Sequence, residues 1–230
     1  MTGRKPYRRI MDATPSPRRM NPEARRTQLL VCAVRAFAAR GLGRAAHADV
    51  AREARVSVPT VFVYFPTRED LVAAVLGEIE RFLMDLIEKM GASSGEASDV
   101  LDETLWTFAE SAETARDYVR VWLDWSTAIR DDVWPRYLDL QERIIGRVRE
   151  VILLGQQAGT IQHRVDAEDA ARIIVGEAHM VTLMMFGGLE RTRIRLFVRH
   201  LVESALSIEG QGSNASANRR GIKPRRRHRV

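Results

Sequence analysis

The sequence contains one cysteine and no long apolar run, and each absence excludes a class of protein. A lone Cys32 cannot form an intramolecular disulfide, which fits a reducing compartment. No stretch approaches the roughly 18 uninterrupted apolar residues of a membrane span. The first 20 residues lack the apolar core of a signal peptide. The sequence therefore predicts a cytoplasmic protein with no membrane partner.

The sequence also lacks the patterns of catalytic and metal sites. Its five histidines are scattered, and none has the spacing of a zinc or di-iron site: His47, His163, His179, His200 and His228. No nucleophile motif, glycine-rich phosphate loop or dinucleotide fingerprint is present. We therefore expect no catalytic residue, no metal and no cofactor. An all-helical enzyme or carrier is the less favoured alternative, and it would require a polar constellation in the body of the protein.

Charge is distributed unevenly along the 230 residues, although the net charge is only +6. It is +5 over residues 1–20, +3 over 21–75, −9 over 76–210 and +7 over 211–230. A chain with basic ends and an acidic middle would orient itself on a polyanion such as DNA. This pattern alone fits a sequence-specific regulator or a nonspecific architectural DNA-binding protein, and the basic cluster in 211–230 would raise nonspecific affinity.

Residues 41–70 carry the most specific pattern of the chain. Apolar residues share one face of a short helix expected over about 47–54, and a tight turn follows it. Ser57 can cap a second short helix, and Pro59 lies in its first turn, where a missing N–H costs nothing. Val61 and Phe65 are four residues apart and are expected to face inward. This is a helix-turn-helix, which presents its second helix to a DNA major groove.

The turn and the end of this unit carry further signals. Pro66 stops the second helix, and Thr67 with Asp70 forms a variant capping box for the long helix that follows. Arg55 stands in the turn where glycine is usual. A left-handed arginine would cost about 1 kcal/mol more than glycine. We therefore expect a slightly different turn, with Arg55 reaching a phosphate.

The outward face of the second helix has few hydrogen-bonding groups. Thr60 and Val63 lie opposite the inward pair, and no Arg, Asn or Gln is present for a bidentate base contact. Direct base readout is therefore expected to be thin. The predicted DNA-binding residues, which include two arginines of the arm before the first helix, are Arg18, Arg19, His47, Ser57, Val58, Pro59, Thr60, Phe62, Val63, Tyr64 and Arg68. Two interpretations of His47 stay open, a phosphate contact or a free surface position.

The rest of the chain predicts helices only, so the expected fold class is all-α with about nine helices. A flexible basic arm over 1–20 precedes a three-helix DNA-binding head over 21–66, whose first helix is capped by Asn21. A helical regulatory and dimerisation body follows over 67–209, and residues 210–230 are predicted to be a disordered basic tail. The body helices are expected at about 68–90, 99–113, 115–130, 135–156, 167–187 and 190–208.

Two blocks of sequence resemble a known family of regulators. VSVPTVFVYFPTREDLVAAVL (56–76) is similar to the signature of the TetR family, and most of all to its quorum-sensing master-regulator branch, the HapR, SmcR and LuxR type. VWLDWSTAIRDDVWP (121–135) is similar to the same branch in register. The resemblance implies an all-helical homodimer whose last two long helices form a four-helix interface. It also implies that the two heads meet successive major grooves.

The resemblance further implies a pocket in the body. The matching positions are Leu83, Leu86, Trp122 and Ile145. Three of them are aliphatic where the branch carries aromatic or polar residues, so any ligand is expected to be a small apolar effector. The interface is expected to use apolar residues of the last two helices: Ile173, Ile174, Ala178, Val181, Leu183, Met184, Leu201 and Leu206. The predicted function is a homodimeric, sequence-specific transcriptional regulator that binds double-stranded DNA at a pseudo-palindromic operator in the nucleoid.

Overall fold

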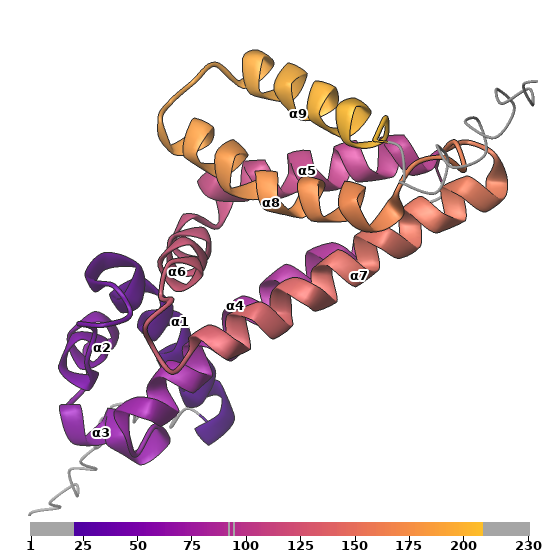
Figure 1. Ribbon diagram of the computed structural model, residues 1–230. Helices are drawn as coiled ribbons and strands as arrows, with labels where there is room; N and C mark the ends of the chain where they lie inside the picture. Colours follow the sequence, from indigo (N-terminus) through magenta and orange to yellow (C-terminus); the bar gives the residue numbers. More distant parts are fainter. Residues whose placement is uncertain (1–20, 92, 94, 209–230) are drawn as a thin grey trace, which may run out of the picture.

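The structure is a computed structural model that describes residues 21–91, 93 and 95–208, and all of its regular elements within these residues are helices (Figure 1). The predicted all-α class is confirmed. The described helices are α1 (Pro22–Arg40), α2 (His47–Ala54), α3 (Val58–Tyr64), α4 (Arg68–Gly91), α5 (Ala97–Thr114), α6 (Arg116–Ser126), α7 (Trp134–Ala158), α8 (Ala167–Phe186) and α9 (Arg191–Ala205).

The first three helices form a compact head at one end of the molecule (Figure 1). Their ends follow the predicted signals. Asn21 caps α1 by accepting a hydrogen bond from the Glu23 N–H, and the Ser57 hydroxyl accepts one from the Thr60 N–H at 3.4 Å. The inward side chains fill the centre of the head completely: Leu29, Ala33, Phe37, Val50, Val61 and Phe65. The predicted inward orientation of Val61 and Phe65 is therefore confirmed.

The remaining helices form an elongated body. α4 and α7 both begin near the head and run side by side away from it, while α8 and α9 form an antiparallel pair at the far end (Figure 1). The predicted capping box at the start of α4 is confirmed, because the Asp70 N–H donates to the Thr67 hydroxyl at 3.0 Å and the Thr67 N–H donates to the Asp70 carboxylate at 3.1 Å.

Head and body are joined through α4 and α6, which both pack against α1. The Asp124 carboxylate on α6 accepts a hydrogen bond from the backbone N–H of Leu42, which lies between α1 and α2, at 2.5 Å. Arg136 on α7 donates to both carboxylate oxygens of Glu80 on α4, at 2.8 and 3.2 Å. A charge-assisted hydrogen bond is stronger than a neutral one. The bond to Asp124 therefore ties the head to α6, and the Arg136–Glu80 pair holds α7 against α4 within the body.

The end of α6 differs from the sequence prediction. The helix was expected to continue to about residue 130, but it ends at Ser126. The Trp125 indole N–H donates to the Val133 carbonyl at 2.9 Å, and this bond holds the following segment in a folded-back loop. The periodicity of a helix cannot reveal this contact, because the contact joins the end of α6 to the start of α7.

Candidate DNA-binding surface and ligand cavity

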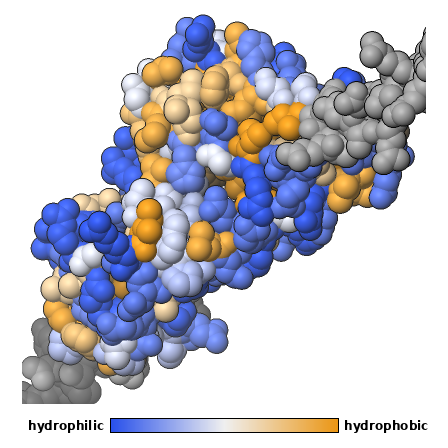
Figure 2. All heavy atoms as spheres, in the orientation of Figure 1, coloured by the Kyte–Doolittle hydropathy of each residue, from blue (hydrophilic) through white to orange (hydrophobic). Residues whose placement is uncertain are grey.

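The predicted recognition helix α3 exposes the face that was expected to contact DNA. Val63 is 76% exposed and Phe62 is 45% exposed, which is unusual for large apolar side chains. Ser57 and Pro59 are also exposed, while Val58, Thr60 and Tyr64 are half-buried beside them. In Figure 2 an apolar spot marks the outer tip of the head, where α3 lies. The structure thus brings all the α3 residues of the predicted site together on one surface.

Two hydroxyl groups at the start of α3 already interact with each other. The side chains of Ser57 and Thr60 form a hydrogen bond of 2.8 Å, in addition to the cap that Ser57 provides. This bond holds both hydroxyls at the exposed N-terminal end of the helix. The DNA contacts expected of these residues, Ser57 to a phosphate and the methyl groups of Thr60 and Val63 to thymine methyl groups, stay predictions.

The position of His47 in the structure excludes one of its two interpretations. Its ring is 6% exposed and stacks on Phe62, with ring centroids 4.0 Å apart. Its Nε2 atom lies 2.7 Å from the Phe65 carbonyl oxygen. The free surface position is therefore wrong. The ring contacts both Phe62 on α3 and the backbone carbonyl of Phe65 at the end of that helix, so His47 orients the recognition helix. A phosphate contact of His47 stays a prediction.

Arg55 also departs from its expected conformation. Its backbone has φ 54° and ψ 46°, so it is left-handed, and the expectation of a different turn is wrong. The Arg55 N–H bonds back to the Arg52 carbonyl at 3.3 Å and closes α2 in the manner usual for glycine. Arg68 at the start of α4 donates to the Leu42 carbonyl at 2.5 Å, so its guanidinium is held against the segment between α1 and α2, and its contact with DNA stays a prediction. Arg18 and Arg19 lie outside the described residues.

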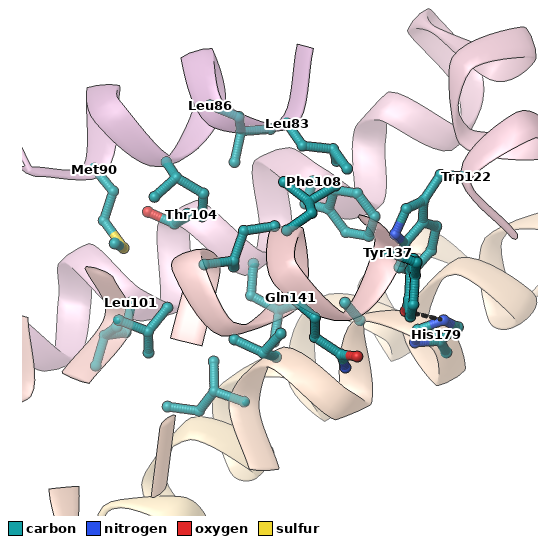
Figure 3. Close-up of a pocket in the computed structure, with 18 residues that line it drawn as sticks. Leu83, Leu86, Met90, Leu101, Thr104, Phe108, Trp122, Tyr137, Gln141 and His179 are labelled. Carbon is teal, nitrogen blue, oxygen red and sulfur yellow. Dashed lines mark hydrogen bonds between the residues drawn. The ribbon is translucent and has the colours of Figure 1, made fainter. Parts of the chain in front are cut away.

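A cavity of about 70 Å³ lies inside the body, between α4, α5, α7 and α8 (Figure 3). It is close to Trp122 of α6, the helix that holds the head. Its lining is almost entirely apolar: Leu83, Leu86, Ile87, Met90, Leu101, Thr104, Leu105, Phe108, Trp122, Tyr137, Leu140, Gln141, Ile144, Val148, Ile174, Val175, Ala178 and His179. Leu83, Leu86 and Trp122 thus line one cavity, and ligand binding there stays a prediction.

Ile145 is not part of this lining, so its assignment to the cavity is wrong. Ile145 is buried elsewhere in the core, and its neighbour Ile144 lines the cavity instead. Adjacent residues on a helix point about 100° apart, so a shift of one position decides which side chain faces the space. The resemblance to the family did not show which of the two adjacent isoleucines, Ile144 or Ile145, faces the cavity.

The polar end of the cavity was not predicted from the sequence. The Tyr137 hydroxyl lies 3.4 Å from Nε2 of His179, and the Trp122 ring lies beside His179 with centroids 4.2 Å apart. Burial lowers the pKa of His179 below its usual value, opposed by a backbone hydrogen bond with Gly176, and burial raises the pKa of Tyr137 to about 12. Both groups are therefore uncharged at neutral pH. Helical spacing could have placed Tyr137 and Gln141 on one face, but it carried no signal that His179 lies opposite.

Apolar side chains are exposed on the outer side of α8 and α9. Ile173, Met180 and Leu183 on α8, Leu196 on α9 and Leu189 between the two helices are all more than one-third exposed. In Figure 2 apolar patches lie over this end of the body. Two residues of the expected interface, Ile174 and Val181, instead point into the protomer and are buried there.

The described residues form neither a membrane span nor a cluster of metal ligands. No helix in 21–91 or 95–208 is long and apolar enough to cross a membrane. Within the same part of the chain, no three His, Cys, Asp or Glu side chains gather as metal ligands would.

A helix-turn-helix head with an exposed recognition helix, carried by a helical body, defines the class of DNA-binding transcriptional regulators. Residues 29–75 match the family model described as bacterial regulatory proteins, tetR family. The HTH-type transcriptional regulator LuxR of Vibrio harveyi is 30% identical over 194 residues, which cover 83% of this chain and 91% of LuxR. The chain therefore belongs to the TetR family, whose members act by binding DNA rather than by catalysis.

Solved structures share the fold at lower sequence identity. FadR of Bacillus subtilis in complex with stearoyl-CoA has a TM-score of 0.65 and 17% identity, over 79% of this chain and 97% of FadR. A cysteine mutant of the TetR-family regulator CifR in complex with 26-base-pair operator DNA has a TM-score of 0.64 and 18% identity. That match covers 85% of this chain and all of the CifR chain.

Proposed function

We propose that this regulator binds a pseudo-palindromic operator as a homodimer in the cytoplasm, with α3 of each protomer in a major groove. The observation that carries the proposal is the exposed face of α3, where Phe62 and Val63 are accessible beside the hydroxyls of Ser57 and Thr60. The CifR relative, solved with operator DNA, supports this use of the fold. Two symmetric heads would read two half-sites about one helical turn apart.

The exposed apolar side of α8 and α9 supports the dimer. Ile173 and Met180 are seven residues apart on α8 and Leu183 follows three residues later, so α8 presents an apolar stripe suited to packing against another helix. Leu196 on α9 adds a further exposed apolar side chain. A two-fold partner would bury these side chains in a four-helix bundle of α8 and α9 from both protomers. Monomeric proteins rarely leave such a surface in contact with water.

The cavity supports regulation by a small apolar effector. It lies between helices of the body and contacts Trp122 on α6, and the same helix holds the head through Asp124. A ligand that moved Trp122 would therefore act on the helix that positions the head. The complex of the FadR relative with stearoyl-CoA shows that this fold can hold a ligand with a hydrocarbon chain.

The test of DNA binding begins with selection of bound sequences from random DNA by the full-length protein. Thr60→Ala combined with Tyr64→Ala should then lower affinity for the selected operator at least about hundredfold, because both side chains reach the groove or its phosphates. Circular dichroism and dimer mass should not change. Thr107→Ala, an exposed threonine on α5, is the matched control. Operator affinity retained by the double variant would remove α3 from the interface.

A salt titration separates this function from nonspecific architectural binding. A specific site keeps its affinity at salt concentrations where random DNA is released, because base contacts do not depend on counterion release. Equal loss of affinity for operator and random DNA would favour the architectural alternative.

Leu183 tests the dimer interface. It is 56% exposed on α8, so Leu183→Glu should not disturb the protomer core, but it should give monomers in light scattering. Leu154→Glu on α7, where the leucine is 62% exposed, is the control and should stay dimeric. A dimer that is unaltered by Leu183→Glu would point to another interface.

The arm with Arg18 and Arg19 contributes to sequence preference in this proposal. Because α3 has no bidentate base reader, insertion of arginine into a narrow, A·T-rich minor groove would add shape readout. Deletion of residues 1–19 should lower affinity and flatten the preference for A·T-rich steps. An equal loss for A·T-rich and G·C-rich operators would make the arm an electrostatic tether only.

A further inference from the structure

The cavity contains no ionised side chain. Its 18 lining residues include no Arg, Lys, Asp or Glu, and its one histidine is half-buried and has a lowered pKa. A carboxylate or ammonium group buried there would lose its hydration without meeting an opposite charge, which is costly. The lining therefore disfavours charged ligands and accepts uncharged ones.

The polar groups that a ligand could use are gathered at one end. Figure 3 shows Tyr137, Gln141 and His179 together beside Trp122, whereas Met90, Leu101 and Thr104 lie toward the opposite end. The hydroxyl of Thr104 donates to the Val100 carbonyl of its own helix at 2.7 Å, so its proton is already used. The cavity thus has a polar end and an apolar end.

The polar end has unused hydrogen-bonding capacity. The Tyr137 hydroxyl interacts with the Ser126 side chain, and it lies 3.4 Å from Nε2 of His179, which is longer than an ordinary hydrogen bond of this type. The Gln141 amide makes no hydrogen bond to the described part of the chain, and it can both donate and accept. A ligand group placed here would meet donors and acceptors that are only partly satisfied.

The apolar end gives a hydrocarbon chain room to extend. The cavity itself has a volume of about 70 Å³, which is less than the roughly 150 Å³ of an engineered protein cavity that binds benzene, so a ligand must displace side chains to fit. Met90 lines the cavity and also two neighbouring surface grooves. Since a methionine side chain is flexible and adapts to its surroundings, a chain of several carbons can displace it toward these grooves.

We infer that the effector is a small uncharged amphiphile whose head group both donates and accepts hydrogen bonds, as a primary amide or alcohol does. The head group lies between Gln141 and the Tyr137–His179 pair, and a short alkyl chain points toward Met90. This inference rests on the effector site in the proposed function, and it assigns to that site a ligand class and an orientation.

The first experiment compares three probes with the same chain length on the full-length dimer at pH 7.5. Octanamide donates and accepts, octan-2-one only accepts, and octanoate is charged. Isothermal titration should give the tightest binding for octanamide, binding about fivefold to tenfold weaker for octan-2-one, and at least about tenfold weaker for octanoate. Octanoate that binds as tightly as octanamide would overturn the inference.

Variants test the orientation. Gln141→Leu and Tyr137→Phe keep side-chain size and should each weaken octanamide about fivefold to tenfold. Gln157→Leu, an exposed glutamine on the same helix α7, is the matched control. Thr104→Val at the opposite end should change octanamide affinity less than about twofold, since its hydroxyl is already bonded. A larger loss for Thr104→Val than for Gln141→Leu would reverse the orientation and overturn the inference.

Two kinds of failure can be told apart. If all three probes bind with similar affinity and Gln141→Leu does not change that affinity, the effector site is supported but the head-group assignment is wrong. If no probe binds, the effector site of the proposed function is wrong as well. Operator binding by the same preparation shows in each case that the protein is folded and active.

Discussion

The head and the body of this regulator use their interiors differently. In the head, Phe37, Val61 and Phe65 are almost completely inaccessible, and none of the residues that line the cavity belongs to the head. In the body, longer helices leave a cavity beside Trp122 and a polar group, His179, in its wall. The difference suggests a division of labour. A tightly packed head keeps the recognition helix in one position, and a loosely filled body can change shape when a ligand fills it.

Removal of a large side chain should affect the head much more than the body. Phe65→Ala should lower the free energy of unfolding by about 3–5 kcal/mol, because its ring fills a closed core. Leu86→Ala should cost only about 1–2 kcal/mol, since Leu86 is half-buried at the edge of an existing cavity. Urea unfolding followed by circular dichroism measures both. Equal losses would mean that the body is packed as tightly as the head.

The link between the two regions should have an intermediate effect. Asp124→Ala removes the acceptor for the Leu42 N–H and should cost about 1–3 kcal/mol, because a backbone donor is left unsatisfied. Asp124→Asn keeps an acceptor oxygen, so it should cost less and serves as the control. If Asp124→Ala changes neither stability nor operator affinity, α6 does not position the head through this bond.

Replacement of Arg55 in the head should increase the stability of the protein slightly. Its left-handed backbone favours glycine, so Arg55→Gly should raise the free energy of unfolding by about 1 kcal/mol or less. Arg52→Gly, in the helical part of α2, is the contrasting variant and should destabilise the protein. Loss of stability in Arg55→Gly would mean that side-chain contacts of Arg55 outweigh its backbone strain.

The body should respond to pH through His179. Burial lowers the pKa of His179 in the folded protein, so the unfolded chain binds a proton more readily. The stability that the neutral ring provides is complete above the unfolded pKa near 6.5 and is lost as pH falls toward the folded value. His179→Gln should reduce the change in the free energy of unfolding between pH 7 and pH 5. His200→Gln, exposed on α9, is the control and should leave the slope unchanged.

The accuracy of the sequence predictions follows the same division between head and body. Ser57, Thr67 and Asp70 were assigned correctly because a helix cap involves residues only three positions apart. The inward orientation of Val61 and Phe65 followed from helical periodicity alone. His47 was misjudged in part because its partners, Phe62 and Phe65, lie more than ten residues away and meet it only in the folded head.

In the body, contacts between distant segments decide the site. Tyr137 and His179 are 42 residues apart, so no local pattern brings them together. Ile145 was misassigned because the side of a helix that faces a cavity depends on packing against four neighbours. The fold class could be read from periodicity and motif, whereas the chemistry of the cavity required the structure.

The central claim is that the rigid head reads DNA through the exposed face of α3. Fluorescence anisotropy with the selected operator tests it most directly, comparing the full-length protein with its Thr60→Ala, Tyr64→Ala variant. Our account predicts at least about a hundredfold loss of operator affinity with an unchanged dimer and unchanged circular dichroism. Operator affinity within about twofold of the unmodified protein would contradict it.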